Sequence, residues 1–169
     1  MKKVFMFLAI STIAISTVVS AQKTVVDIAL GSKVHTTLVA AVQAAELVAT
    51  LQGAGPFTVF APVNAAFEKL PAGTVENLLK PENKGTLAKI LTYHVVAGNI
   101  DAAAVVEAIK KGKGKAVLTT VSGGKLTATI KEGKVILTDE NGGTATVVAT
   151  DLKAENGIVH VIDAVVLPK

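Results

Sequence analysis

The first half of the chain carries apolar residues at helical spacing. Residues Val25–Leu30 are predicted to form a short helix that ends at a glycine, Gly31. Within Thr36–Leu51, apolar residues recur every three or four positions, and this spacing of one buried face predicts a single helix over the whole range. The same pattern predicts further helices at residues 64–70, 75–79, 84–91 and 102–111.

The second half changes to short runs that are rich in Val, Ile and Thr, as is typical of strands. Turn signals such as Ser122-Gly123-Gly124 and Glu132-Gly133 separate these runs, and connections this short join antiparallel neighbours. We therefore predict an α+β protein whose helical N-terminal half packs on a compact β-structure. The expected strands are residues 57–61, 93–96, 116–121, 125–131, 134–138, 144–150 and 158–167.

The first 21 residues have the pattern of a secretory signal peptide. Lys2 and Lys3 precede a short apolar segment, and Val19-Ser20-Ala21 places small residues at a cleavage site. The uncharged run from Val4 to Gln22 approaches the ~20 residues that span a bilayer. Five hydroxyl side chains interrupt it, which favours cleavage over a membrane anchor. We expect removal of residues 1–21, a single domain at residues 22–169, and export to the periplasm or the cell exterior without a stable membrane anchor.

Composition and charge exclude several classes of site. The chain has no cysteine, which excludes disulfides, thiolate metal sites and cysteine nucleophiles. Beyond residue 21 there are 15 lysines, no arginine and 13 acidic residues, so the charge is nearly balanced. Nucleic acid is not an expected partner, because phosphate and base-edge recognition favour the bidentate guanidinium of arginine. The basic cluster Lys110, Lys111, Lys113 and Lys115 is interpreted as a solvated loop after a helix, with a site for acidic polysaccharide as the alternative.

The sequence does not contain an arrangement typical of catalysis. The serines that follow the signal segment do not lie in a Gly-x-Ser-x-Gly elbow, and there is no phosphate loop or calcium loop. A metal site would need His35, His94 and His160 to converge from distant segments. His160 and Asp163 would face opposite sides of a strand, which disfavours a direct pair. We expect neither an enzyme nor a cofactor, with a hydrolase that uses surface carboxylates as a remaining alternative.

Three blocks of the sequence suggest a family. They are Gly55–Phe67, Leu91–Val96 and Asn156–Pro168, and in order and spacing they resemble the signature blocks and the central Tyr-His motif of the fasciclin-like (FAS1) domain. The resemblance implies a wedge-shaped antiparallel β-sandwich with a helical cover, in a small secreted module of bacterial type. The block residues expected to support the fold are Thr58, Phe60, Ala61, Pro62, Asn64, Phe67, Tyr93, His94, Asn156, Gly157, His160, Asp163 and Pro168.

Individual block residues are expected to have structural roles. Asn64 is predicted to be the N-cap of the helix at residues 64–70, because its side-chain oxygen can accept from free backbone N–H groups. Val63, just before it, replaces a threonine that is usual in the family. Tyr93 and His94 are predicted to point to opposite faces of a strand. A buried His94 would need partners for both ring nitrogens, and a core histidine of this kind is favoured over a catalytic base.

The resemblance also implies how the protein binds. Animal members of the family are associated with integrin binding through an Asp followed by an aliphatic residue and through the Tyr-His region, which Asp151-Leu152 and Tyr93-His94 match here. Because this chain looks bacterial, we expect adhesion to a surface or matrix protein or a polysaccharide, and a weak homo-oligomer is a further option. The alternative is a carrier of an apolar small molecule such as a carotenoid, since Glu46 is the only charge within Thr36–Leu51.

Overall fold

The computed structural model describes residues 23–169, so the predicted signal peptide and its cleavage site lie outside the described residues. Within this range there is no helix with the length and apolar character needed to cross a membrane.

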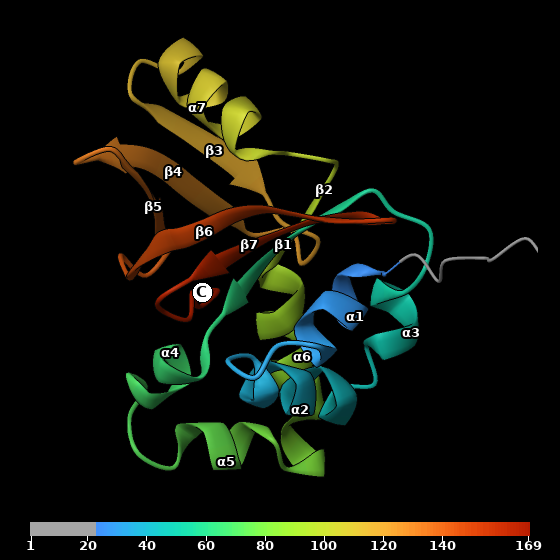
Figure 1. The fold of residues 1–169 in the computed structure, drawn as a ribbon. Helices are drawn as coiled ribbons and strands as arrows, with labels where there is room; N and C mark the ends of the chain where they lie inside the picture. Colours follow the sequence, from blue (N-terminus) through green and yellow to red (C-terminus); the bar gives the residue numbers. More distant parts are fainter. Residues whose placement is uncertain (1–22) are drawn as a thin grey trace, which may run out of the picture.

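The strands of this range form one sheet in the order β2-β1-β7-β6-β5-β4-β3 (Figure 1). Neighbouring strands are antiparallel except for β1 and β7, which are parallel. An isolated bridge between Val96 and Thr120 links the two ends of the sheet, which is therefore nearly closed. The strands are β1 (Phe57–Pro62), β2 (Val95–Ala97), β3 (Lys115–Thr119), β4 (Lys125–Lys131), β5 (Lys134–Thr138), β6 (Thr144–Ala154) and β7 (Gly157–Ile162).

Strand β6 connects the two parts of the sheet. Its first residues, Thr144–Thr146, pair with β5, and from Val147 onward it pairs with β7. The register shifts twice between Val147 and Leu152, and Asp151 has a left-handed backbone with a φ of 60°. Such bulges bend a strand and increase its twist. The bend lets β3, β4 and β5 diverge from β1 and β7, which produces the wedge seen in Figure 1.

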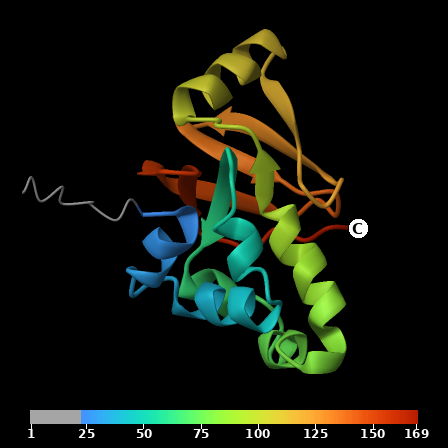
Figure 2. The ribbon, with the colours of Figure 1, turned by 90° about the vertical axis from the view of Figure 1, so that its right-hand side faces the viewer.

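The helices occupy two sides of the sheet. Helix α7 lies over β3 and β4, and the other helices gather beyond β1 and β7, as Figures 1 and 2 show. The helices are α1 (Val25–Leu30), α2 (Thr36–Ala44), α3 (Val48–Leu51), α4 (Asn64–Glu68), α5 (Thr74–Leu78), the 3-10 turn η1 (Pro81–Asn83), α6 (Lys84–Tyr93) and α7 (Ala102–Lys111).

Two apolar cores lie on either side of β1 and β7. Phe60 and Ile162 belong to the core beneath α7, whereas Ala61 and Val159 belong to the core beneath α1, α2 and α6. Successive side chains of a strand point to opposite faces, so both faces of these two strands are buried. This explains why β1 and β7 are almost continuously apolar, as is usual for strands that are covered on both sides.

The predicted α+β class is confirmed, and α1, α7, β4 and β5 begin and end at the predicted residues. The single helix predicted over Thr36–Leu51 is wrong. It ends at Ala44, because Glu46 adopts a left-handed backbone with a φ of 57°. The Leu47 N–H donates to the Val42 carbonyl at 3.0 Å and the Glu46 N–H to the Gln43 carbonyl at 3.0 Å, which is the Schellman pattern of a helix end.

The strand predicted over residues 93–96 is also wrong in its first half. Helix α6 continues through Tyr93, His94 is its C-cap, and β2 begins at Val95. Tyr93 and His94 therefore do not alternate across a strand. The last predicted strand is shorter than expected, because β7 ends at Ile162 and the chain continues to Lys169 without regular structure.

Candidate functional site

Asn156 joins three segments of the helical side of the molecule. Its Oδ1 accepts from the Val25 N–H at 2.9 Å, at the start of α1. Its Nδ2 donates to the carbonyls of Leu51 at 2.7 Å and Gly53 at 3.0 Å, at the end of α3. All the polar atoms of this amide thus have partners within the chain.

Asn64 caps a different helix from the one predicted. Its Oδ1 accepts from the Thr37 N–H at 3.0 Å and from the Thr36 hydroxyl at 3.2 Å, both in the first turn of α2. The N-cap of α4 is Val63, whose side chain cannot accept a hydrogen bond. The prediction that Asn64 caps its own helix is therefore wrong, because the N–H group that it reaches belongs to Thr37, 27 residues earlier in the chain.

Tyr93 is fully buried, and its hydroxyl group both donates and accepts a hydrogen bond. The hydroxyl donates to the Lys125 carbonyl at 2.7 Å and accepts from the Glu140 N–H at 3.3 Å. Burial raises the pKa of this phenol. The ring also lies against Gly124, where an added Cβ would come within 2.5 Å of a ring carbon.

His94 is buried with both ring nitrogens satisfied. Nδ1 donates to the Ile90 carbonyl at 2.8 Å, one turn earlier in α6, and Nε2 accepts from the Val166 N–H at 3.2 Å. Burial lowers the pKa of His94 to about 4, against the opposing effects of the Ile90 carbonyl and the Asp139 carboxylate. The ring is neutral at neutral pH. Because Tyr93 and His94 are 0% and 2% exposed, neither side chain lies on the surface, and the expected role of the Tyr-His region in binding stays a prediction.

Thr58 and His160 hold the segment that precedes α7. The Thr58 hydroxyl donates to the Gly98 carbonyl at 2.7 Å and accepts from the Ile100 N–H at 2.9 Å. His160 Nε2 donates to the Ile100 carbonyl at 2.8 Å, and its ring stacks on Phe60 with centroids 5.6 Å apart. Both side chains are buried, and both bind backbone groups rather than each other.

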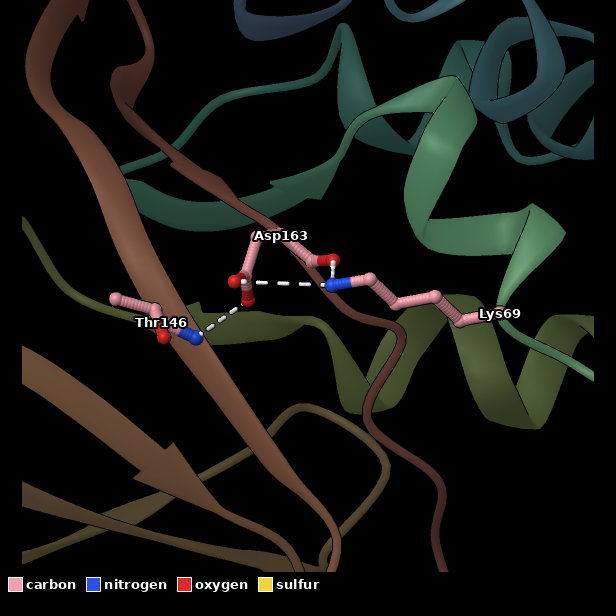
Figure 3. Close-up of polar contacts among 3 residues, drawn as sticks. All are labelled: Lys69, Thr146 and Asp163. Carbon is pink, nitrogen blue, oxygen red and sulfur yellow. Dashed lines mark hydrogen bonds and ion pairs between the residues drawn. The ribbon is translucent and has the colours of Figure 1, made fainter.

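Asp163 follows β7 and links it to β6 and to α4 (Figure 3). Its Oδ1 accepts from the Thr146 N–H at 2.7 Å. Lys69 Nζ lies 3.7 Å from the other carboxylate oxygen and donates to the Asp163 carbonyl at 2.6 Å. His160 and Asp163 therefore have separate partners, in agreement with the expectation that they do not pair.

The remaining block residues also contact the interior of the fold. Phe60, Ala61 and Pro62 are buried, and Phe67 is half-buried against the core beneath α1, α2 and α6. Gly157 has no room for a side chain, because an added Cβ would lie 1.9 Å from the Phe57 carbonyl oxygen. The Pro168 carbonyl accepts from the Asn141 side chain at 3.1 Å.

Asp139 is a buried polar residue that the sequence reasoning missed. Its Oδ1 accepts from the N–H groups of Asn141 at 3.0 Å and Gly143 at 2.7 Å, within the β5–β6 turn. Its Oδ2 accepts from the Leu167 N–H at 2.9 Å. The Asp-x-Asn-Gly-Gly pattern could have identified the turn. It could not have identified the bond to the C-terminal segment.

Asp151 and Leu152 lie at the bulge of β6 and are exposed. The Asp151 carboxylate accepts from the Ala102 N–H at 2.9 Å, at the first residue of α7, while Leu152 is 39% exposed. All residues from Val148 to Lys153 are exposed, and this part of β6 has β7 on one side but extends beyond its pairing with β5. We refer to Val148–Lys153 as the β6 edge.

A partly open apolar cavity of about 60 Å³ lies among α1, α2, α3, β1 and α6. Its walls are almost entirely aliphatic, and Leu30, which lines it, is 50% exposed. We refer to it as the helix cavity. The lining includes Val26, Leu38, Val42, Leu51, Val59 and Leu91.

The three histidines do not meet. His35 lies against Ser32, with Nδ1 2.7 Å from the Ser32 hydroxyl, while its Nε2 is buried without a hydrogen bond. Burial lowers the pKa of His35, and the nearby Ala61 carbonyl only partly opposes this. Among residues 23–169, no group of three His, Asp or Glu side chains is placed to hold a metal ion.

The match to a protein family covers nearly all of the described residues. A model of the Fasciclin domain matches residues 33–168. The chain belongs to the Fasciclin domain family. This Fasciclin domain is 52% identical over 145 residues to Protein sll1483 of Synechocystis sp., a match that covers 86% of this chain and 73% of that protein. It is 37% identical over 122 residues to the cell surface glycolipoprotein MPB83 of Mycobacterium bovis, covering 72% of this chain and 48% of that protein.

A solved structure supports the fold itself. The FAS1 domain pair of the insect cell adhesion molecule Fasciclin I is similar to this chain with a TM-score of 0.61 and 22% identity. The match covers 75% of this chain and 42% of that one. The FAS1 fold expected from the three blocks is therefore confirmed.

Proposed function

We propose that this Fasciclin domain is a noncovalent adhesion module that acts outside the cytoplasm and binds a surface or matrix protein through the β6 edge. The observation that carries the proposal is the contrast between the motif blocks and this strand. The polar groups of Asn156, His94 and Thr58 are used inside the fold. The β6 edge instead presents six consecutive exposed residues to a partner.

The chemistry of the β6 edge suits a protein partner. Val148 is 56% exposed and Leu152 is 39% exposed, so two aliphatic side chains lie on the surface beside the charged Asp151 and Lys153. Burial of such apolar groups within a polar rim is the usual arrangement of a protein interface. A strand edge that extends beyond its neighbour can also pair with a segment of another protein.

The relatives support a binding role rather than a catalytic one. The similar FAS1 pair comes from a molecule named for cell adhesion, and MPB83 is named a cell surface protein. We extend both properties to this chain as part of the proposal. The signal-peptide pattern of residues 1–21 gives the route of export, and loss of those residues from the exported protein is the corresponding expectation.

The test uses beads coated with the purified protein and cells of the organism that produces it. We expect Leu152→Lys to reduce bead adhesion about tenfold, because it places a charge where the partner would bury an apolar side chain. Val34→Lys is the matched control, since Val34 is 53% exposed and lies in the loop between α1 and α2, outside the β6 edge. Asp151 is unsuitable for this purpose because it also caps α7. Equal adhesion of both variants and the wild type would refute the proposal.

The helix cavity favours a second candidate function, the transport of an apolar small molecule. Its volume of about 60 Å³ is well below the ~300 Å³ of typical ligand pockets, so a ligand would have to separate α1 from α2. Native extraction with organic solvent tests this function. A stoichiometric pigment or lipid that is lost from Val42→Trp, which fills the cavity, supports it; a ligand-free native protein refutes it.

A further inference from the structure

Charge is unevenly distributed over the molecule. Residues 110–134 contain seven lysines and a single acid, Glu132, whereas the rest of residues 23–169 contain eight lysines and twelve acids. All seven lysines are exposed. Within the described range only Lys111 among them forms an ion pair, with Glu107, and both partners are well exposed. The end of α7 and strands β3 to β5 therefore form a strongly basic region on an otherwise acidic molecule.

The strand register shows which side chains share the open face of this region. Lys115, Thr129, Ile136 and Thr146 are partners in successive strand pairs, and so are Val117, Thr127, Thr138 and Thr144. Directly paired residues point to the same side of a sheet. The alternate positions, such as Leu126 and Leu137, are fully buried. Both rows therefore lie on the solvent side of the sheet, opposite the core that α7 covers.

Lysines flank these rows at both ends. Lys115 begins β3 and pairs with Thr129, and Lys131, two residues further along β4, pairs with Lys134. At the other end, Lys125 pairs with Thr119. The resulting surface, which we call the lysine–threonine face, consists of Lys113, Lys115, Val117, Thr119, Lys125, Thr127, Thr129, Lys131, Lys134, Ile136, Thr138, Thr144 and Thr146.

The loop that leads into this face has a defined conformation. The Gly114 N–H donates to the Ile109 carbonyl at 2.8 Å and closes α7 with a Schellman pattern. Lys113 occupies the left-handed position, with a φ of 57°. An added Cβ at Gly112 would lie 1.9 Å from the Lys115 carbonyl oxygen, so the loop packs closely against the start of β3. These contacts hold the backbone at Lys113, and its side chain extends from this backbone into solvent.

We propose that the lysine–threonine face binds an acidic polysaccharide. Lysine ammonium groups can pair with carboxylate or sulfate groups that repeat along such a chain. The threonine hydroxyls between them both donate and accept hydrogen bonds, as sugar hydroxyls require. The region contains no arginine for phosphate recognition. It also contains no aromatic side chain, and its exposed apolar residues are too short to anchor it in a bilayer interface.

The lysine–threonine face adjoins the β6 edge at Val148 but shares no tested residue with it. The two proposals can therefore fail separately. Loss of bead adhesion in Leu152→Lys concerns the β6 edge, whereas the test variant of the following experiment changes only lysines of residues 110–134 and is measured on purified polysaccharides.

The experiment measures binding of the purified protein to heparin and to polygalacturonate, with dextran as a neutral control. The test variant combines Lys113→Glu, Lys131→Glu and Lys134→Glu. The matched control combines Lys23→Glu, Lys33→Glu and Lys80→Glu, which are also exposed, lie outside both surfaces and change the net charge by the same amount. We expect the test variant to bind at least about tenfold more weakly, and wild-type binding to fall about tenfold between ~0.05 M and ~0.5 M salt.

Several outcomes would overturn the proposal. Equal losses in both triple variants would show an effect of net charge alone. Tighter binding of the wild type to anionic phospholipid vesicles or to duplex DNA would assign the face to another class of partner. Should the glutamate variant fail to fold by circular dichroism, the triple variant with glutamine at the same three positions replaces it, and unchanged binding by that folded variant refutes the proposal.

Discussion

Asn156 connects segments that are distant in the sequence, because its side chain bonds to α1, to α3 and to the loop after α3. We expect Asn156→Ala to lower the free energy of unfolding by about 2–4 kcal/mol, since three hydrogen bonds are lost and partly buried backbone groups remain unpaired. Urea denaturation measures the change. Asn99→Ala, at an exposed loop position, should change it by less than about 0.5 kcal/mol. Similar losses in both variants would contradict the role of Asn156.

Residue-level expectations were accurate where the role follows from side-chain chemistry alone. A buried histidine must satisfy both ring nitrogens, and His94 does so. The prediction for Asn64 was wrong because α4 begins at Asn64 itself, with Val63 as its N-cap, and the amide oxygen bonds to the first turn of α2 instead. Sequence proximity cannot decide between such partners.

At the scale of elements, the hydrophobic pattern identified most helices and strands but not all of their ends. The apolar spacing of Thr36–Leu51 continues across the Schellman end at Glu46, where no glycine marks the break. Val95 and Val96 favour a strand, but α6 continues through Tyr93 and the His94 N–H donates to the Leu91 carbonyl at 3.1 Å. The side chains of Tyr93 and His94 bond to Lys125 and Val166, which lie far along the chain and could not be identified as partners from the sequence. The pairing of β1 with β7 could not be predicted, because a parallel partner can lie anywhere later in the sequence.

The residues that make up the lysine–threonine face and the β6 edge also depend on how the strands pair. The basic cluster at residues 110–115 was visible in the sequence as a solvated loop. Its continuation through Lys131 and Lys134 depends on the strand register, which places these residues at the same end of the sheet as Lys115. The β6 edge follows from the different lengths of β5 and β6 and was predicted only as the dipeptide Asp151-Leu152.

For the whole molecule, we expect the free energy of unfolding to fall as the pH drops from about 6.5 to about 4. The pKa of His94 is lowered to about 4 by burial, whereas an imidazole in the unfolded chain has a pKa near 6.5. Above pH ~6.5 both states are neutral, so stability is unaffected. Between these values the unfolded chain binds a proton that the folded protein excludes, and the loss reaches about 3 kcal/mol.

Urea denaturation at a series of pH values measures this dependence. His35 contributes in the same direction, because burial also lowers its pKa. The control is His94→Gln, which removes the titrating ring and should reduce the slope by up to about one proton per molecule. Carboxylates titrate in both proteins and do not affect the difference. Identical slopes for the two proteins would contradict the pKa of His94.

The parallel pairing of β1 with β7 determines when the protein can fold during its synthesis. Residues 57–62 leave the ribosome about 100 residues before their partners at 157–162. Until then β1 has only the short β2 beside it, and His94 lacks the Val166 N–H. A nascent chain therefore cannot complete either core before residues 157–162 have left the ribosome, and the final step of folding must wait for β7.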